Sequence, residues 1–464
     1  MNIGKRDLAW SYLARFLTIG ANVILLPLIM RFLSGDELGL WYVFASISQI
    51  VNLFDFGFNA TISRHMTYAW SGASKLEKVY MAQSCGKEKN TRLMSEIIYT
   101  CRIVYALISV FAILIMMTAG TLYINGVVEG GLTKQIFLSW AIYAVAVFLN
   151  LFYGYWTSLL QGIGAVAERN KMGVFSKFFQ IIIAAGLLSM GMGLAGFVIA
   201  YALSGISLRI MGRYFFKRKV DGLHIDSNVS PSRVKECFSA VWESAWRNGI
   251  VMLAEYFTTQ VNTLICAYFI DLESVSVYGV VTQITSTIAS VSTAYFNAYQ
   301  PQYSSACLQR NVDLQKKLTC VSDLVYKIIF GSGMLAFLIL GLPILHVIRP
   351  GMKIGIPFSL LMGLFYYLYT QQSLFVSMIA SSNRILCCRS YIITAAFSFF
   401  ITIILVKEFG LGIWGLVIGQ VAANLAYNNW KWPVFVLRET GIRYKDIYTT
   451  GAEGIKNALK QEFS

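Results

Sequence analysis

Charged side chains within long apolar stretches are the residues of this chain most able to do chemistry. Six of them stand out: Arg15, Asp55, Arg102, Glu255, Asp323 and Lys327. A charge at the centre of a membrane helix costs about 2.5–3.5 kcal/mol on an insertion scale. These groups must therefore pair, reach the membrane surface or line a hydrated cavity. Anion binding, ion pairing and proton exchange are the chemistry that they could support.

Arg15 and Glu255 each belong to a polar stripe. Each stripe has the spacing i, i+3, i+7 of one helical face: Arg15, Thr18 and Asn22, and then Glu255, Thr258 and Asn262. A polar face directed at lipid would be costly, so both should face protein or a cavity. We predict an Arg15–Glu255 pair that closes a cytoplasmic entrance and opens when Glu255 is protonated. The predicted coupling or gate residues are Glu255, Asp55, Lys327 and Asn262. For Arg102, Asp323 and Lys327 the alternative is that their side chains snorkel to the membrane surface.

Aromatic rings beside amides form the other candidate site. One group is Asn150, Tyr153 and Trp156, and the other is Tyr366, Tyr369 and Gln371. Flat amphipathic rings next to amide groups suit the faces of sugars, and we predict all six as substrate-binding. Tyr and Trp also anchor helices at membrane interfaces, which is the alternative.

Catalytic and metal-binding patterns are not found. The chain has three histidines, and Cys387 and Cys388 are adjacent, without the spacing of metal ligands. We therefore expect no metal, no cofactor and no enzymatic activity. A membrane glycosyltransferase or polymerase is disfavoured, because the longest predicted outer loop has only about a dozen residues, too short for a catalytic site.

The composition indicates the elements that carry these residues. Apolar residues make up 56% of the 464 residues and charged residues 13%, against roughly 25% charged in soluble domains. Apolar runs of about 20 residues predict an all-α polytopic membrane protein with about twelve transmembrane helices. The predicted spans are 8–32, 39–62, 97–121, 135–160, 174–190, 194–213, 248–270, 276–300, 325–347, 356–380, 390–406 and 411–430.

The net charge is +15, and the distribution of the basic residues agrees with these predicted spans. Of the 38 Lys and Arg residues, 29 lie in the segments that would be inside and four in the outer loops. The positive-inside rule then places both termini in the cytoplasm. The basic surplus is a topology signal whose partner is the lipid bilayer, and nucleic acid is excluded.

An internal duplication divides the chain into two halves. Phe58-Asn59-Ala60 matches Phe296-Asn297-Ala298, and Gly191-x-Gly193-Leu194-x-Gly196 matches Gly410-x-Gly412-Ile413-x-Gly415. Each glycine run is expected at a tight outer turn between two apolar helices. We also pair Arg102-Ile103-Val104-Tyr105 with Lys327-Ile328-Ile329-Phe330. Matches six spans apart predict parallel repeats. The expected domains are a six-helix lobe (1–213), a cytoplasmic linker (214–245), a second lobe (246–430) and a cytoplasmic tail (431–464).

The first 65 residues resemble the polysaccharide flippases of the O-antigen type, within the multidrug/oligosaccharidyl-lipid/polysaccharide exporter superfamily. The resemblance lies in Arg15, Pro27-x-x-x-Arg31-x-Leu33-Ser34-Gly35, Leu38-Gly39-Leu40-Trp41, Asp55-Phe56-Gly57 and Arg64. It implies two lobes around a central cavity in a bacterial inner membrane. It also implies alternating-access translocation of a polyprenyl-diphosphate-linked oligosaccharide to the outer leaflet for surface polysaccharide assembly.

Residue roles and partners follow from the same resemblance. Arg15 and Arg102 would face the diphosphate and Asn22 would line the cavity beside them, with H+ or Na+ as coupling ion and a polysaccharide polymerase as partner. The intramembrane charges balance, however, so a drug/cation antiporter of the same superfamily is the alternative.

Overall fold

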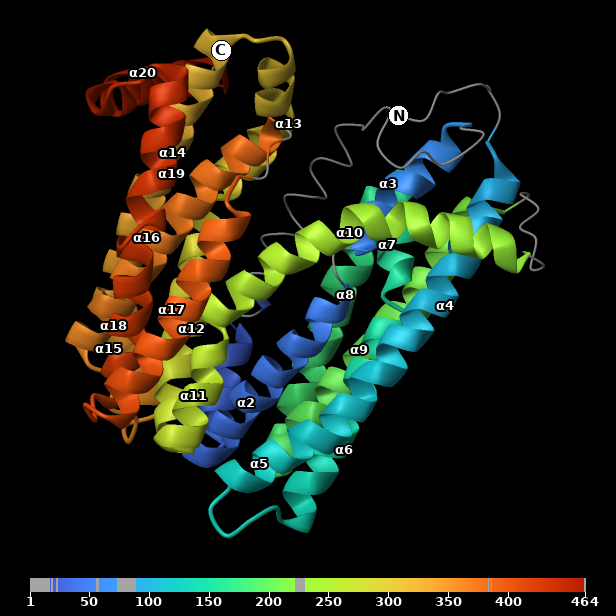
Figure 1. Ribbon diagram of the computed structural model, residues 1–464. Helices are drawn as coiled ribbons and strands as arrows, with labels where there is room; N and C mark the ends of the chain where they lie inside the picture. The colour runs from blue at the N-terminus through green and yellow to red at the C-terminus, as the bar shows by residue number, and fades with distance from the viewer. Residues whose placement is uncertain are drawn as a thin grey trace. The chain divides into compact units, whose positions relative to one another are not determined.

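The computed structural model describes residues 17, 20–21, 24–55, 58–72, 89–221, 230–382, 384 and 386–462. These residues are helical almost throughout and include no β-strand. The chain forms two compact units, unit 1 (Met1–Leu253) and unit 2 (Ala254–Ser464). Figure 1 shows long helices running side by side in each unit. The division between them falls inside one helix, eight residues beyond the end of the expected 214–245 linker.

Unit 1 contains the helices up to that division, and residues 24–32 are also helical. Its elements are α2 (Gly35–Asn52), η1 (Leu53–Asp55), α3 (Phe58–Trp70), α4 (Thr91–Ile115), η2 (Met116–Gly120), α5 (Thr121–Val127), α6 (Lys134–Phe152), α7 (Tyr155–Gly162), α8 (Val166–Ser189), α9 (Gly193–Lys219) and most of α10 (Pro231–Thr259). Part of the expected linker thus belongs to α10, whose Phe238 and Trp242 rings lie 6.1 and 6.0 Å from Phe58 of α3.

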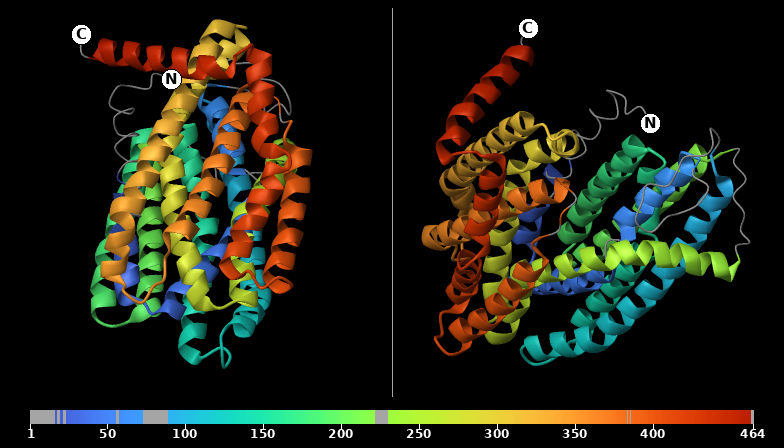
Figure 2. Two further views of the ribbon diagram at one scale, coloured as in Figure 1. Left: turned by 90° about the vertical axis from the view of Figure 1, so that its left-hand side faces the viewer. Right: turned by 45° about the horizontal axis from the view of Figure 1, so that its top comes forward.

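Unit 2 contains the remaining helices. They are α11 (Val261–Phe269), α12 (Leu272–Ser292), α13 (Ala294–Leu308), α14 (Val312–Ala336), η3 (Phe337–Gly341), α15 (Leu342–Ile348), α16 (Ile356–Ser381), α17 (Cys388–Lys407), α18 (Gly412–Leu425), α19 (Asn428–Thr440) and α20 (Tyr444–Glu462). Both α19 and α20 fall largely in the expected tail. Figure 2 shows α20 at one end of this unit, where it packs against α14.

Six stretches of the described chain are long and apolar enough to cross a membrane, by length and composition. They are Thr91–Val127, Lys134–Gly162, Val166–Ser189, Gly193–Lys219, Val312–Ile348 and Cys388–Lys407, with mean hydropathies of 1.6 to 2.4. Each overlaps a predicted span. The multi-pass, all-α prediction is therefore confirmed, whereas the count of twelve spans stays a prediction.

One pair of helices shows the duplication in detail. The 25-residue α4 and α14 each lead into a five-residue π-helical segment and then a seven-residue helix. All three elements start 221 residues apart in the two halves. Asn90 and Asn311 cap the two long helices in the same way, each side chain accepting the N–H three residues later at 3.0 Å.

This register corrects the pairing that we made from the sequence. At an offset of 221 residues, Arg102 is equivalent to Asp323 and Tyr105 to Tyr326. Pairing Arg102 with Lys327 is wrong by four residues, about one helical turn. Apolar residues recur every turn, so short apolar matches cannot distinguish registers one turn apart.

The two glycine runs form tight turns between antiparallel helices, as predicted. Gly191 and Gly193 have φ of 78° and 49°, and Gly410 and Gly412 have φ of 61° and 52°. Each turn needs glycine because other residues rarely adopt this left-handed region. The resulting hairpins, α8–α9 and α17–α18, are among the most closely packed helix pairs.

Candidate functional site

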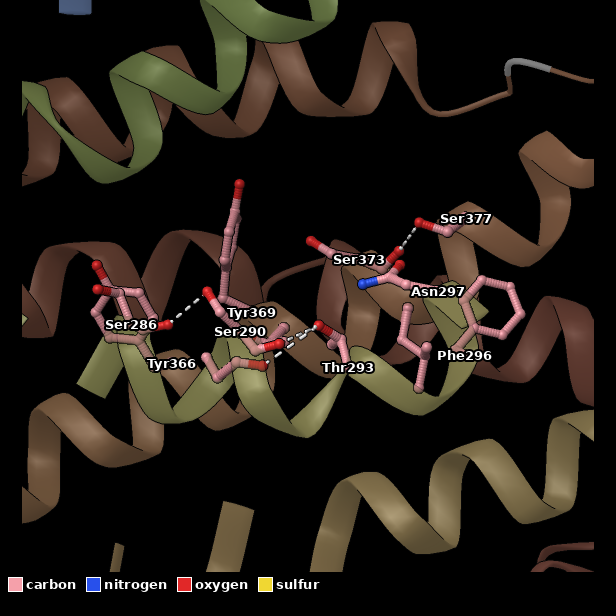
Figure 3. Close-up of a pocket in the computed structure, with 12 residues that line it drawn as sticks. Ser286, Ser290, Thr293, Phe296, Asn297, Tyr366, Tyr369, Ser373 and Ser377 are labelled. Carbon is pink, nitrogen blue, oxygen red and sulfur yellow. Dashed lines mark hydrogen bonds between the residues drawn. The ribbon is translucent and has the colours of Figure 1, made fainter. Parts of the chain in front are cut away.

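A cavity of about 270 Å³ lies in unit 2 between α12, α13 and α16. Figure 3 shows its side chains converging from these helices. Its lining is Ser286, Ala289, Ser290, Thr293, Phe296, Asn297, Tyr366, Tyr369, Thr370, Ser373, Leu374 and Ser377. Hydroxyl groups and rings dominate, and no residue of the lining is charged. The cavity can therefore offer many hydrogen bonds and aromatic faces to a neutral polar ligand.

Several of these hydroxyls are held by their own helices. Ser290 donates to the Ser286 carbonyl at 2.9 Å, and Ser377 to the Ser373 carbonyl at 2.8 Å. A hydroxyl that donates to the backbone keeps its oxygen lone pairs available as an acceptor. These two hydroxyl oxygens are thus fixed in place as acceptors.

Tyr366 and Tyr369 were predicted from the sequence, whereas the serines were missed. A signal was present in the spacing. Ser286, Ser290, Thr293 and Asn297 follow the pattern i, i+4, i+7, i+11, and Tyr366, Thr370, Ser373 and Ser377 repeat it. Two polar stripes of equal spacing on apolar helices indicate facing walls.

Glu255, on α10, is not part of this lining but lies near Tyr369, which is. Glu255 is half-buried, and its carboxylate interacts electrostatically with the hydroxyls of Tyr369 and Tyr391. Glu255 forms no ion pair with any described residue. Its predicted partner Arg15 lies outside the described residues, as does Asn22.

A second polar group in unit 2 surrounds a buried ion pair. Lys327 Nζ lies 2.8 Å from Asp323 Oδ2, and Asp323 is fully buried. Gln371 donates to Asp323 Oδ1 at 3.0 Å. Lys327 also lies 4.8 and 5.1 Å from the ring centroids of Tyr444 and Tyr448 of α20. Gln371 therefore holds a carboxylate and does not line the cavity.

Asn262 belongs to a third group, a network of buried amides. Its side chain donates to the Leu416 carbonyl at 3.0 Å. Gln420 donates to the Thr258 carbonyl at 2.7 Å, Asn424 to the Gln420 carbonyl at 2.9 Å, and Gln372 to Asn424 at 3.3 Å. This network joins α10, α11, α16 and α18, so Asn262 ties helices together.

In unit 1, Asp55 accepts a hydrogen bond from Tyr105 of α4, the helix that is equivalent to α14 of unit 2. The Tyr105 hydroxyl donates to Asp55 Oδ1 at 2.6 Å. The equivalent Tyr326 donates to the Tyr367 carbonyl of α16 at 2.5 Å. Both tyrosines are buried and both bind a neighbouring helix.

Arg209 of α9 is the functional candidate in unit 1 that sequence reasoning missed. It is only 8% exposed. Its Nη2 donates to Asn150 Oδ1 at 2.7 Å and to the Ala146 carbonyl at 3.3 Å, while Nε has no partner among the described residues. The guanidinium also lies 5.8 Å from the Tyr153 ring. No ion pair in the described part of the chain includes Arg209.

The remaining predicted residues of unit 1 lie elsewhere. Trp156 packs on Tyr155 and Phe216, with ring centroids 4.8 and 5.3 Å apart, at the edge of an apolar core. Arg102 is exposed on α4. Asn150 and Tyr153 are thus brought together by Arg209, and Trp156 and Arg102 are not part of that group.

Metal ligands do not gather anywhere in the described residues: no group of three or more His, Cys, Asp or Glu side chains could hold an ion there.

Comparisons with known structures agree with this architecture. An inward-facing multidrug resistance MATE family transporter of the MOP superfamily superposes with a TM-score of 0.62 at 15% identity, covering 90% of this chain and 94% of that one. The inward closed lipid II flippase MurJ gives a TM-score of 0.66 at 12% identity, covering 97% and 91%. A MATE structure in the bent conformation gives 0.55 at 15% identity, covering 97% and 98%. At these identities the likenesses show the fold alone: this chain has an all-α, two-lobe fold similar to that of these transporters.

The family follows from the sequence itself. The profile of the family described as "Polysaccharide biosynthesis protein" matches residues 5–307. The chain therefore belongs to this family of polysaccharide biosynthesis proteins. Among curated proteins, no sequence matches it.

Proposed function

We propose that this protein is a flippase that moves a polyprenyl-diphosphate-linked oligosaccharide from the cytoplasmic to the outer leaflet by alternating access. The observation that carries the proposal is the uncharged cavity of α12, α13 and α16, lined by hydroxyls, an amide and tyrosine rings. Sugars present hydroxyls on their edges and C–H groups on their faces. Such a lining binds both, and it suits a neutral oligosaccharide better than an ion.

The diphosphate would need a cation in a desolvated place. Arg209 is a buried guanidinium whose described acceptors are both neutral, so it retains a full positive charge to attract a diphosphate. Charge-assisted hydrogen bonds from Arg to phosphate are among the strongest in proteins. Arg15 and Arg102 remain candidates for the same ligand.

The proposed setting is the inner membrane of a bacterium, with both termini in the cytoplasm, as the distribution of 29 inner and four outer basic residues favours. Glu255 is the proposed site of H+ or Na+ coupling, since it is a half-buried carboxylate near Tyr369 of the cavity. The sugars transported would supply surface polysaccharide assembly, where a polymerase would use them.

Reconstituted vesicles test the proposal directly. A lipid-linked oligosaccharide with a fluorescent sugar is placed in the inner leaflet, and its arrival outside is followed with an impermeant quencher. Ser290→Leu should slow transport roughly two- to tenfold, because each lost hydrogen bond is worth about 0.5–1.5 kcal/mol. Ser332→Leu is the matched control, an exposed serine of unit 2 that also donates to its own helix, at 3.1 Å, and lies outside the cavity.

Transport that is equal in wild type, Ser290→Leu and empty vesicles would refute the flippase. The position of Glu255 favours one other function, a drug/cation antiporter, because a carboxylate near a tyrosine of the cavity also attracts organic cations. Uptake of ethidium driven by a proton gradient and abolished by Glu255→Gln, without lipid transport, would establish that alternative.

A further inference from the structure

The helix α20 has one face docked on α14. Its residues Ile447, Gly451 and Gly454, at i, i+4 and i+7, are buried in this contact. A β-carbon at Gly451 would lie 2.9 Å from the Cys320 carbonyl oxygen, and one at Gly454 would clash with Val321. The two glycines thus let α20 pack closely on α14. Figures 1 and 2 show α20 lying crosswise to the long helices of unit 2.

This contact lies next to the part of α14 that is apolar enough to cross a membrane. The helical stretch Val312–Ile348 has 37 residues. At 1.5 Å per residue it is about 55 Å long, against roughly 30 Å for the hydrocarbon core of a bilayer. All five of its Asp and Lys residues precede Ile328. We therefore expect residues 328–348 to cross the bilayer, and residues 312–327, which include the contact with α20, to extend beyond it.

A second face of α20 is aromatic and apolar. It consists of Tyr444, Tyr448, Ala452 and Ile455, at i, i+4, i+8 and i+11. The two tyrosines are 60% and 46% exposed. Lys327 Nζ donates to the Tyr444 hydroxyl at 3.4 Å, and Lys327 is the last charged residue before the apolar part of α14. The aromatic face is therefore the face of α20 that is directed toward the expected membrane.

Charged residues occupy the rest of the helix in a regular order. At about 100° per residue, Lys445 and Lys456 lie about 60–80° from Tyr448, on the side away from α14, and both are exposed. Asp446 and Glu453 lie about 140–160° from Tyr448, almost opposite the aromatic face. Cations thus flank the aromatic face, and the carboxylates point away from it. This arrangement is complementary to an anionic lipid surface.

We propose that α20 lies flat on the surface of the bilayer, with its aromatic face in the lipid interface and Lys445 and Lys456 on anionic phospholipid headgroups. The docked face fixes the helix to α14, where α14 leaves the membrane. The surface needs only described residues of unit 2 and is independent of what the protein transports. The proposed orientation assigns it to the cytoplasmic leaflet.

Photocrosslinking in phosphatidylglycerol vesicles tests which face of α20 meets lipid. The full-length protein carries p-benzoylphenylalanine in place of either Tyr448 or Glu453, and the mass of the irradiated protein shows whether one lipid has been added. A lipid adduct is expected from position 448 and not from position 453, which is the matched exposed control on the opposite face. No adduct from position 448, or equal adducts from both positions, would overturn the proposal.

Hydrogen exchange of the α20 amides tests the role of the two cations. The full-length protein is compared in nanodiscs of phosphatidylglycerol and of zwitterionic phosphatidylcholine. A cation near an anionic surface strengthens binding about fivefold. Lys445→Gln/Lys456→Gln should therefore make α20 exchange up to roughly 25-fold faster in phosphatidylglycerol. In phosphatidylcholine the variant and the wild type should agree within about twofold.

The matched control is Lys353→Gln/Arg389→Gln, which removes two exposed cations of unit 2 that are not on α20. Exchange of α20 should stay within about twofold of wild type in both lipids, since distant exposed charges are screened. Equal acceleration of exchange by the two double variants would overturn the proposal. Equal acceleration by Lys445→Gln/Lys456→Gln in the two lipids would overturn it as well, because the lysines would then stabilise α20 without anionic headgroups.

Discussion

Lys327 and Arg209 have different partners, so the loss of their charge should affect stability to different extents. Lys327 is paired with Asp323 at 2.8 Å, and Asp323 has no exposed surface. Lys327→Met keeps the stem and removes the charge, so Asp323 is left with the hydrogen bond from Gln371. Removing one partner of a buried pair costs about 3–5 kcal/mol, and the 12% exposure of the Lys327 side chain favours the lower end.

Arg209→Met should behave differently. The guanidinium has neutral acceptors, Asn150 and the Ala146 carbonyl, so no charge is left behind when it is removed. The lost charge-assisted bonds, about 1.5–3 kcal/mol each, are offset by the desolvation of a buried ion, which costs several kcal/mol. We expect the free energy of unfolding to change by less than about 1.5 kcal/mol, within the cost of an unmade hydrogen bond at Asn150.

Denaturant unfolding in mixed micelles, followed by tryptophan fluorescence, measures both variants. Adding Asp323→Asn to Lys327→Met should recover most of the lost stability, because an amide needs no cation. The vesicle assay should show that Arg209→Met abolishes transport although the protein remains folded. Equal destabilisation by Arg209→Met and Lys327→Met would refute the reasoning, because it would mean that Arg209 has an acidic partner.

The other predictions concern packing and orientation. In Gly454→Leu the new side chain would clash with Val321, so α20 should detach from α14. The buried Cys320 should then react faster with maleimide. Gly331→Leu is the control: it has open space around it and should not change that rate. Gly193→Ala should lower the free energy of unfolding by about 1–3 kcal/mol, because alanine is strained in the left-handed region and because the cap from Glu37, which accepts the Leu194 N–H at 3.1 Å, would be lost. Gly186→Ala, in open space on α8, should be neutral or stabilising in a parallel thermal melt. Gln420→Leu should cost about 1–3 kcal/mol by leaving the amide network unsatisfied, against little change for the exposed Gln309→Leu in the same denaturant titration. A reporter active only in the cytoplasm should be active after Ser464 and inactive in the 125–132 loop; the reverse result would invert the proposed orientation.

The fold could be predicted from the sequence where the signal was local and strong. Apolar runs predicted helices at the right places, and the two glycine runs predicted the turns at Gly191 and Gly410, because only glycine is at ease there. The duplication was also visible in the sequence. Its register was not, because apolar residues recur every helical turn and short apolar matches cannot distinguish registers one turn apart.

The site could be predicted only in part, because the partners of polar side chains depend on tertiary packing. Gln371 and Gln372 are neighbours in the sequence, but about 100° apart on α16. One holds Asp323 and the other joins the amide network. Arg209 carried one signal, a charge within the predicted span 194–213, but nothing in the sequence indicates that Asn150 and a carbonyl would be its acceptors. The arrangement of Arg15 and Asn22 stays a prediction.

The matching π-helical segments bear on the history of the chain. A π-helical turn weakens the regular hydrogen-bond ladder and is retained where it serves a purpose. Finding one at the same place in both halves, 221 residues apart and five residues long each time, would require two identical insertions if it arose after the duplication. A single origin is simpler. The ancestral half-length protein already carried this irregular turn, and the gene that doubled passed it to both descendants.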